Sequence, residues 1–312
     1  MTTNEVVRTL HLAGGEVATL IHVPALQNTR GAVLYVHGFA DYFFQTHLAE
    51  HFIARGYDFY AVDLRRYGRS LRPGDIPYFI TDLATYQEEL DRAVAQIRAD
   101  GHRHLVVLAH STGGLIAALW LHDRRDAIRA DALVLNSPWL DLQENWLMRT
   151  VGTWLVRAIG PLLPRVAIPQ GLNSVYAESI SAKAHGEWEF NTSWKPLTPQ
   201  PVYLGWLAAV RRGQARLHKG LDLPMPVLVM HSDLSRLDLK EWSPAAMSVD
   251  TVLDVEQIER WAPALGPDVT TVTIDGALHD LILSPQPVRQ RVFAAMDAWL
   301  DRTAPATAHE TE

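Results

Sequence analysis

A serine in a short turn is the strongest chemical signal in the sequence. Ser111 follows the apolar run 105–109 and is followed by Gly113 and Gly114. Small residues two positions before and after a serine let a strand turn sharply into a helix, usually as Gly-x-Ser-x-Gly. Ala109 replaces the first glycine, which adds only a methyl group. The segment predicts a nucleophilic Ser111 at a helix start, where the dipole favours negative charge; the alternative is a structural turn without chemistry.

Two backbone N–H groups are expected to stabilise the oxyanion that such a nucleophile would generate. The apolar run 33–36 ends in His37 and Gly38, which precede Phe39. With a nucleophilic serine in this kind of turn, one N–H comes from the loop after an early strand, and the other from the residue after the serine. Phe39 and Thr112 occupy these positions, and their side chains do not matter because the donors are main-chain groups. We expect His37 to hold the loop and not to transfer protons.

A histidine near the end of the sequence is the predicted general base. His279 comes after the predicted strand 270–274 and the turn residue Gly276. The chain has 14 histidines, so only the position of His279, after a strand and in the chain order serine, acid, histidine, distinguishes it. The alternative is a structural histidine.

Two aspartates are candidates for the acid that orients this histidine. Asp233 is the nearest carboxylate to the end of the predicted strand 227–230. Asp250 lies further on, just before a predicted helix at 253–261. Either could fix the tautomer of the imidazole and stabilise the imidazolium. Asp233 could instead cap a turn and Asp250 the helix.

The elements that must position these residues alternate between strand and helix. Apolar runs that end in polar loops predict the strands, and apolar residues at helical spacing predict the helices. Such units predict an α/β fold, a mostly parallel sheet with helices on both faces. The predicted strands are 33–36, 58–62, 104–109, 132–136, 227–230 and 270–274, and the predicted helices are 44–55, 81–99, 113–122, 253–261 and 288–300.

A region without clear strand signals interrupts this pattern from about residue 139 to 220. It contains several prolines and is rich in tryptophan, and we expect it to be a helical cap inserted into the core. The predicted organisation is core at 1–138, cap at 139–220, core again at 221–302 and a disordered tail at 303–312. Five tryptophans are candidates for lining a substrate pocket, since sites favour domain junctions, or for packing the insertion together: Trp146, Trp154, Trp188, Trp194 and Trp206.

Composition and charge exclude several classes of protein. The chain has no cysteine, which excludes disulfides and cysteine nucleophiles, and its net charge is −7 without a basic stripe, so we expect no nucleic-acid partner. The most apolar run, 105–121, is interrupted by polar and glycine residues, and the first ten residues do not resemble a signal peptide. We therefore expect a cytoplasmic protein without a membrane span. No metal-ligand spacing is visible, and no cofactor or metal is expected.

Taken together, these motifs resemble the α/β-hydrolase superfamily, and most closely its branch of monoacylglycerol lipases, lysophospholipases and serine aminopeptidase-like proteins. The resemblance covers roughly 15–138 and 222–301, with a helical cap between. The residues that carry it are His37-Gly38, Asp63 with Gly68-Arg69-Ser70, the run from His110 to Gly114, and Gly276 with His279.

The resemblance bears on the choice of acid. The family places its acid about thirty residues before the histidine, in a small-x-Asp-x-x-x-Asp stretch that Ser248 to Asp254 matches. Asp250 lies 29 residues before His279 and Asp233 lies 46, so the resemblance favours Asp250, with 234–247 as an insertion. In the loop after strand 58–62, Arg66 replaces the first glycine of the family pattern Asp-x-x-Gly-x-Gly-x-Ser.

The expected activity is hydrolysis of carboxylic esters with an apolar acyl or alkyl group, through an acyl-enzyme on Ser111. Monoacylglycerols and lysophospholipids are candidate substrates; chain length, stereopreference and oligomeric state are not specified by the sequence. Peptidase, amidase and acyltransferase activities use the same residues and remain alternatives, as does a non-catalytic ligand-binding protein of this fold. Dehalogenases and epoxide hydrolases of this fold carry an aspartate where Ser111 stands, and we do not expect them.

Overall fold

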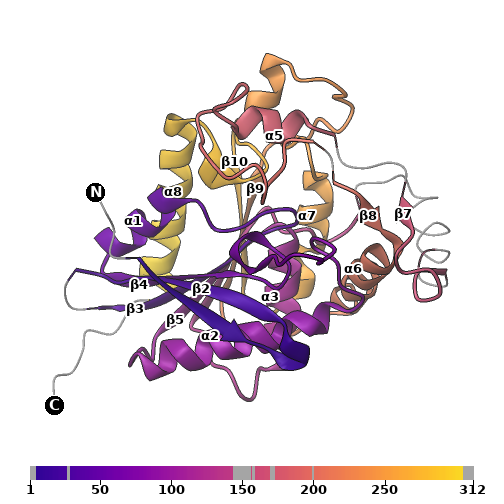
Figure 1. Ribbon diagram of the computed structural model, residues 1–312. Helices are drawn as coiled ribbons and strands as arrows, with labels where there is room; N and C mark the ends of the chain where they lie inside the picture. The colour runs from indigo at the N-terminus through magenta and orange to yellow at the C-terminus, as the bar shows by residue number, and fades with distance from the viewer. Residues whose placement is uncertain are drawn as a thin grey trace, which may run out of the picture.

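The protein is built on one large sheet, seen in a computed structural model that describes residues 5–26, 29–142, 156, 159–168, 173–198 and 200–304. The sheet has eight strands in the order β1-β2-β4-β3-β5-β6-β9-β10 (Figure 1). All neighbouring strands are parallel except in the pairs β1–β2 and β2–β4. The strands are β1 (Val6–His11), β2 (Val17–Val23), β3 (Gly31–Val36), β4 (Tyr57–Asp63), β5 (Leu105–His110), β6 (Ala132–Asn136), β9 (Val227–Ser232) and β10 (Val269–Ile274).

Helices cover both faces of this sheet. Leu48 and Phe52 of α1 and Val292 of α8 belong to one buried apolar cluster. Leu90 of α2 and Ile258 of α7 belong to the other cluster, on the opposite face. The predicted α/β fold with helices on both faces is therefore confirmed. The helices are α1 (Thr46–Ala54), α2 (Gln87–Ala99), α3 (Thr112–Asp123), α5 (Val175–Ile180), α6 (Leu204–Leu217), α7 (Val255–Trp261) and α8 (Gln286–Thr303).

The central strands are mainly apolar, and they are buried along their whole length because they are covered on both faces. Every residue of β3, β4, β5 and β6 is buried. This is the pattern of parallel strands between two helical layers, without the alternation of a half-exposed strand. It explains why continuous apolar runs identified these strands in the sequence.

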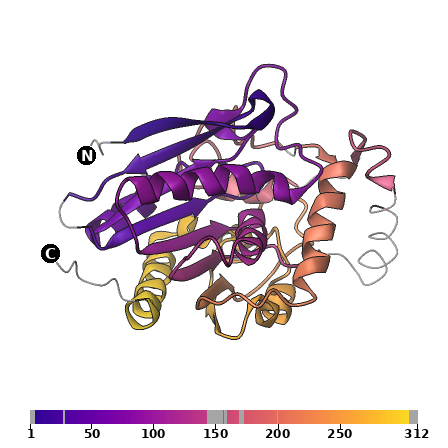
Figure 2. The same ribbon diagram turned by 90° about the horizontal axis from the view of Figure 1, so that it is seen from below.

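The edge of the sheet was not predicted. β1 and β2 form an antiparallel hairpin around the turn Ala13–Gly15, and Figure 2 shows it along one side of the molecule, with α2 beside it. The residues of β1 are mostly exposed, so the strand lacks an apolar run. The predicted helix 81–99 also begins later, because a 3₁₀ turn (Leu83–Tyr86) capped by Asp82 precedes α2.

The segment between β6 and β9, called here the inserted segment, contains α5, α6 and a two-stranded ladder. The ladder pairs β7 (Ala167–Ile168) with β8 (Val202–Tyr203), strands too short to give a sequence signal. In Figure 1, α5 lies at the top of the molecule and α6 at one side. The boundaries of a cap at 139–220 and of the core parts 1–138 and 221–302 stay predictions, and 305–312 of the predicted tail lies outside the described residues. Within the described ranges, no helix is long and apolar enough to cross a membrane.

Candidate active site

Ser111 lies in a sharp turn between β5 and α3. Its φ is +52° and its ψ −120°, a left-handed backbone conformation that non-glycine residues rarely adopt and that clusters at functional sites. Backbone hydrogen bonds hold the turn: the Ser111 N–H donates to the Asn136 carbonyl at 3.0 Å, and the Trp139 N–H donates to the Ser111 carbonyl at 3.0 Å. The turn that closes β5 is therefore joined directly to the end of β6.

Close backbone approach explains the small residues around the serine. A Cβ atom on Gly113 would lie 2.3 Å from the carbonyl oxygen of His37, and one on Gly114 would lie 2.8 Å from the Cβ of Pro138. A Cβ on Gly38 would lie 3.1 Å from the Cβ of Ser111. The glycines thus let the loop after β3 pack against the start of α3.

The structure brings Ser111, His279 and Asp250 together in one chain of hydrogen bonds. Oγ of Ser111 lies 3.0 Å from Nε2 of His279, and Nδ1 of His279 lies 2.8 Å from Oδ2 of Asp250. The side chains of His279 and Asp250 are 3% and 0% exposed. With its proton on Nδ1, His279 donates to the carboxylate and leaves Nε2 free to accept from the serine hydroxyl.

The two candidate acids occupy different places. Oδ1 of Asp250 accepts hydrogen bonds from the N–H groups of Val252 at 2.7 Å and Leu253 at 2.8 Å, so the second oxygen is directed at His279. Oδ1 of Asp233 instead accepts from the N–H of Gly276 at 2.8 Å. Asp233 supports the turn that precedes His279, while Asp250 contacts the imidazole itself.

The stretch 234–247 leaves the end of β9 and returns to it. The Asp250 N–H donates to the Leu234 carbonyl, and the Arg236 N–H donates to the Asp250 carbonyl, both at 2.8 Å. The hydroxyl of Ser235 also donates to the carbonyl of Leu253 at 2.8 Å. A loop closed by its own ends in this way brings Asp250 back to the strand end, as expected if 234–247 is an insertion.

The loop after β3 has the features expected of an oxyanion site. His37 is fully buried; its Nδ1 lies 2.8 Å from the Gly38 carbonyl, and its Nε2 accepts the N–H of Leu64 at 3.1 Å. Burial lowers its pKa, so His37 is a neutral structural group. In the described part of the chain, the N–H groups of Phe39 and Thr112 donate to no protein acceptor. Both are available to a ligand.

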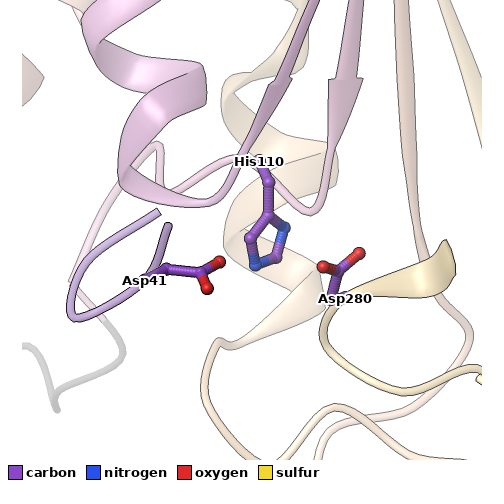
Figure 3. A group of neighbouring side chains, drawn as sticks. All are labelled: Asp41, His110 and Asp280. Atoms are coloured by element: carbon purple, nitrogen blue, oxygen red, sulfur yellow. The ribbon is translucent and has the colours of Figure 1, made fainter. Parts of the chain in front are cut away.

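Three further titratable side chains converge beside His279. His110 lies between Asp41 and Asp280 in Figure 3, and one ligand atom of each lies within 4.8 Å of the others. The ring centroids of His110 and His279 are 4.8 Å apart. Burial lowers the pKa of His110, which favours its neutral form.

These three residues have the donor types of a metal site, but the carboxylates already have partners. Nζ of Lys195 lies 2.9 Å from Oδ1 of Asp41. Asp280 accepts from Nδ2 of Asn136 at 2.6 Å and from Nε2 of Gln45 at 3.3 Å. An ammonium at this distance supplies the positive charge that a cation would bring, and we assign the cluster no metal. These residues were not predicted from the sequence, although Asp280 adjoins His279 and Asp41 follows Phe39 by two positions.

The predicted tryptophans fall in three different surroundings. Trp206 is buried, its ring centroid 4.2 Å from that of Phe39, and Trp139 stacks on it at 5.8 Å. Trp188 donates to the Leu283 carbonyl and stacks on a histidine, and Trp194 packs edge-on against a tyrosine. Trp146 and Trp154 lie outside the described residues. Of the three that the structure describes, Trp206 is therefore the one that contacts Phe39, the proposed oxyanion residue.

Comparison with known proteins agrees with this architecture. Residues 27–286 match the family described as serine aminopeptidase, S33. The monoacylglycerol lipase of Mycolicibacterium smegmatis is 29% identical over 220 residues, 67% of this chain and 71% of the relative. A soluble variant of monoglyceride lipase from Saccharomyces cerevisiae, in complex with a substrate analog, aligns with a TM-score of 0.74 at 20% identity, over 99% of this chain and 97% of that one. The monoacylglycerol lipase of Paleococcus ferrophilus gives 0.66 at 20% identity, over 90% and 98%.

The fold and the family together define a serine hydrolase of the α/β-hydrolase superfamily. The chain belongs to the serine aminopeptidase S33 family. The two solved structures share its fold. The family match and the related monoacylglycerol lipase confirm the resemblance that the sequence motifs indicated.

Proposed function

We propose that the protein hydrolyses carboxylic esters through an acyl-enzyme on Ser111. The observation that carries the proposal is the hydrogen-bonded chain from Ser111 through His279 to Asp250, at 3.0 and 2.8 Å. A nucleophile within hydrogen-bond reach of a base, with the base oriented by a third group, is the arrangement that activates a serine.

The first half of the reaction forms the acyl-enzyme. Nε2 of His279 accepts the proton of the Ser111 hydroxyl while Oγ bonds to the ester carbonyl carbon. The imidazolium then gives that proton to the alkoxy oxygen of the ester. The bond between this oxygen and the carbonyl carbon breaks, and the alcohol leaves. Asp250 accepts the hydrogen bond from Nδ1–H throughout. It stabilises the imidazolium without itself taking a proton.

The second half releases the acid. A water molecule transfers a proton to Nε2 of His279 and bonds to the acyl carbon. The tetrahedral species then collapses, Oγ of Ser111 recovers the proton from His279, and the carboxylic acid departs. The N–H groups of Phe39 and Thr112 stabilise the oxyanion in both halves, assisted by the N-terminus of α3.

An apolar substrate group fits the residues next to the oxyanion loop. The ring of Phe39 contacts Trp206 and lies 5.4 Å from Tyr78, centroid to centroid. Trp139 extends the same aromatic group through Trp206. Together with the relative named monoacylglycerol lipase, this favours acyl esters, monoacylglycerols among them.

Aminopeptidase activity is the second candidate, because the family bears that name. Such an enzyme binds the ammonium group of its substrate, for which a buried carboxylate is the natural partner. Among the described residues near His279, Asp41 is paired with Lys195, Asp280 binds Asn136 and Gln45, and Asp250 binds His279. These engaged carboxylates favour the ester substrate.

A substrate panel tests the proposal. Turnover of p-nitrophenyl esters and monoacylglycerols would be measured beside amino-acid p-nitroanilides, together with labelling by a fluorophosphonate probe and mapping of the labelled peptide. We expect ester turnover and a label on Ser111. Preferred cleavage of the anilides would assign a peptidase, and an unlabelled protein without turnover would leave a non-catalytic member of the family.

A further inference from the structure

A buried ion pair joins the inserted segment to the loop that carries Phe39. Nζ of Lys195 lies 2.9 Å from Oδ1 of Asp41, and the two side chains are only 8% and 2% exposed. Burial acts to raise the pKa of Asp41, but the Lys195 ammonium outweighs it and holds this pKa below its ordinary value. The charge of Asp41 is thus maintained in the interior by a residue 154 positions away.

Two other contacts tie the same turn of the inserted segment to the core. The N–H of Asn191 donates to Oη of Tyr42 at 2.7 Å, and the hydroxyl of Tyr78 donates to the carbonyl of Trp194 at 3.1 Å. The N–H groups of Trp194 and Lys195 both donate to the Asn191 carbonyl, which makes the turn 191–195 compact. We call this turn, with its three contacts, the clip.

The loop beneath the clip needs such support. Ala40, between Phe39 and Asp41, has a φ of +49°, in the left-handed region that is unfavourable for residues with a Cβ. Strained conformations of this kind persist only when their surroundings hold them. The position of the Phe39 N–H therefore depends on what fixes residues 40–42.

We propose that Lys195 is a positioning residue for the oxyanion site: by pairing with Asp41 it holds the loop 39–42 in the conformation that presents the Phe39 N–H to the substrate. The inference rests on the proposed function. Without Lys195, Asp41 is a buried carboxylate close to that of Asp280 (Figure 3), and breaking a buried pair on one side leaves an uncompensated charge. The carboxylate then moves toward water and takes the loop with it. When Asp41 and Lys195 are both replaced by neutral residues, no buried charge remains to displace the loop.

The test compares a variant that loses only the charge of Lys195 with a variant that loses the charges of both Lys195 and Asp41. Lys195→Met is expected to lower kcat, counted per Ser111 titrated with a fluorophosphonate, by about 30-fold with KM changed less than about threefold, because an oxyanion donor acts mainly on the transition state. The double variant Asp41→Asn with Lys195→Met is expected to recover kcat to within about fivefold of wild type. Lys219→Met, at an exposed lysine of the same segment, is the matched control.

Two results would overturn the proposal. A Lys195→Met protein with a lower Tm but an unchanged kcat per titrated serine would make the ion pair merely structural, and a double variant no better than the single one would exclude the charge argument. If Lys195→Met does not fold, Lys195→Gln decides, since its amide can still donate to Asp41 but leaves the buried carboxylate without a counter-charge. Its kcat should fall several-fold at constant KM, and an unchanged kcat would again overturn the proposal. A wild-type protein without ester turnover or labelling would contradict the proposed function instead.

Discussion

Nε2 of His279 lies 3.0 Å from Oγ of Ser111, although the two residues are 168 positions apart. Ser111 follows β5 and His279 follows β10, and β6 and β9 lie between these strands in the sheet. The contact forms because the carboxyl ends of parallel strands meet at one edge of the sheet, where α/β proteins bind their ligands.

Replacing the nucleophile should abolish turnover and leave the fold intact. Ser111→Ala removes one oxygen atom from a turn whose backbone hydrogen bonds involve only main-chain groups. We expect kcat for a p-nitrophenyl ester to fall by about 10⁴-fold or more, with an unchanged circular dichroism spectrum and no fluorophosphonate label. An active and labelled variant would show that another residue is the nucleophile.

Part of this site can be predicted from the sequence because the patterns that indicate it are short and local. The turn at Ser111 and the strand before His279 are each contained in about ten residues. β1 was missed because an exposed edge strand has no apolar run, although Gly14 and Gly15 marked the turn that follows it. β2 is buried, but Thr19 and His22 interrupt its apolar residues. Lys195 could not be found, because it comes from an irregular segment and its partner is set by tertiary packing alone.

The acid was ambiguous in the sequence for a related reason. A carboxylate soon after a strand is a local signal, and Asp233 carries it. The backbone bonds that close the loop between Leu234 and Asp250 are not visible in the sequence, so only the family spacing pointed to Asp250.

Exchanging each aspartate for asparagine should separate the two. In Asp250→Asn, the side-chain oxygen keeps the N–H groups of Val252 and Leu253, so the amide nitrogen faces His279. Nδ1 must then accept a hydrogen bond, the ring proton moves to Nε2, and the base can no longer take the Ser111 proton. We expect kcat to fall by about 10⁴-fold.

Asp233→Asn is the control for this change. The asparagine oxygen can still accept the N–H of Gly276, so kcat should fall about tenfold at most. Circular dichroism should show both variants folded. The reverse ranking would make Asp233 the acid, and two equally mild effects would mean that neither aspartate orients His279.

Buried histidines should make the protein less stable in acid. Burial lowers the pKa of His47 from 6.5 to about 4. Between these values the unfolded chain binds more protons than the folded one, so the free energy of unfolding falls as the pH falls. The contribution of His47 is complete above pH 6.5 and is lost by about pH 4, and it amounts to about 2–3 kcal/mol. Lowered pKa values at His37 and His110 act in the same direction.

Urea unfolding at a series of pH values measures this effect. His47→Gln, whose amide can still donate to the Ile282 carbonyl that His47 contacts at 2.9 Å, should lose about 2 kcal/mol less than wild type between pH 7 and 4. His11→Gln, at an exposed histidine of β1, should follow the wild-type curve. Parallel curves for all three proteins would exclude His47 as a source of acid sensitivity.

Trp206 should set the preference for the acyl chain. Its indole packs on the ring of Phe39, so Trp206→Phe opens space beside the proposed oxyanion site with less damage than truncation to alanine would cause. A methylene group in such a pocket contributes about 1–3 kcal/mol to discrimination, and we expect kcat/KM to shift toward longer p-nitrophenyl esters by at least tenfold relative to acetate. Trp188→Phe, at a tryptophan that donates to the Leu283 carbonyl and stacks on His47, should leave the ranking of chain lengths unchanged. An equal loss for every ester in the Trp206 variant would indicate damaged packing and no contact with the acyl chain.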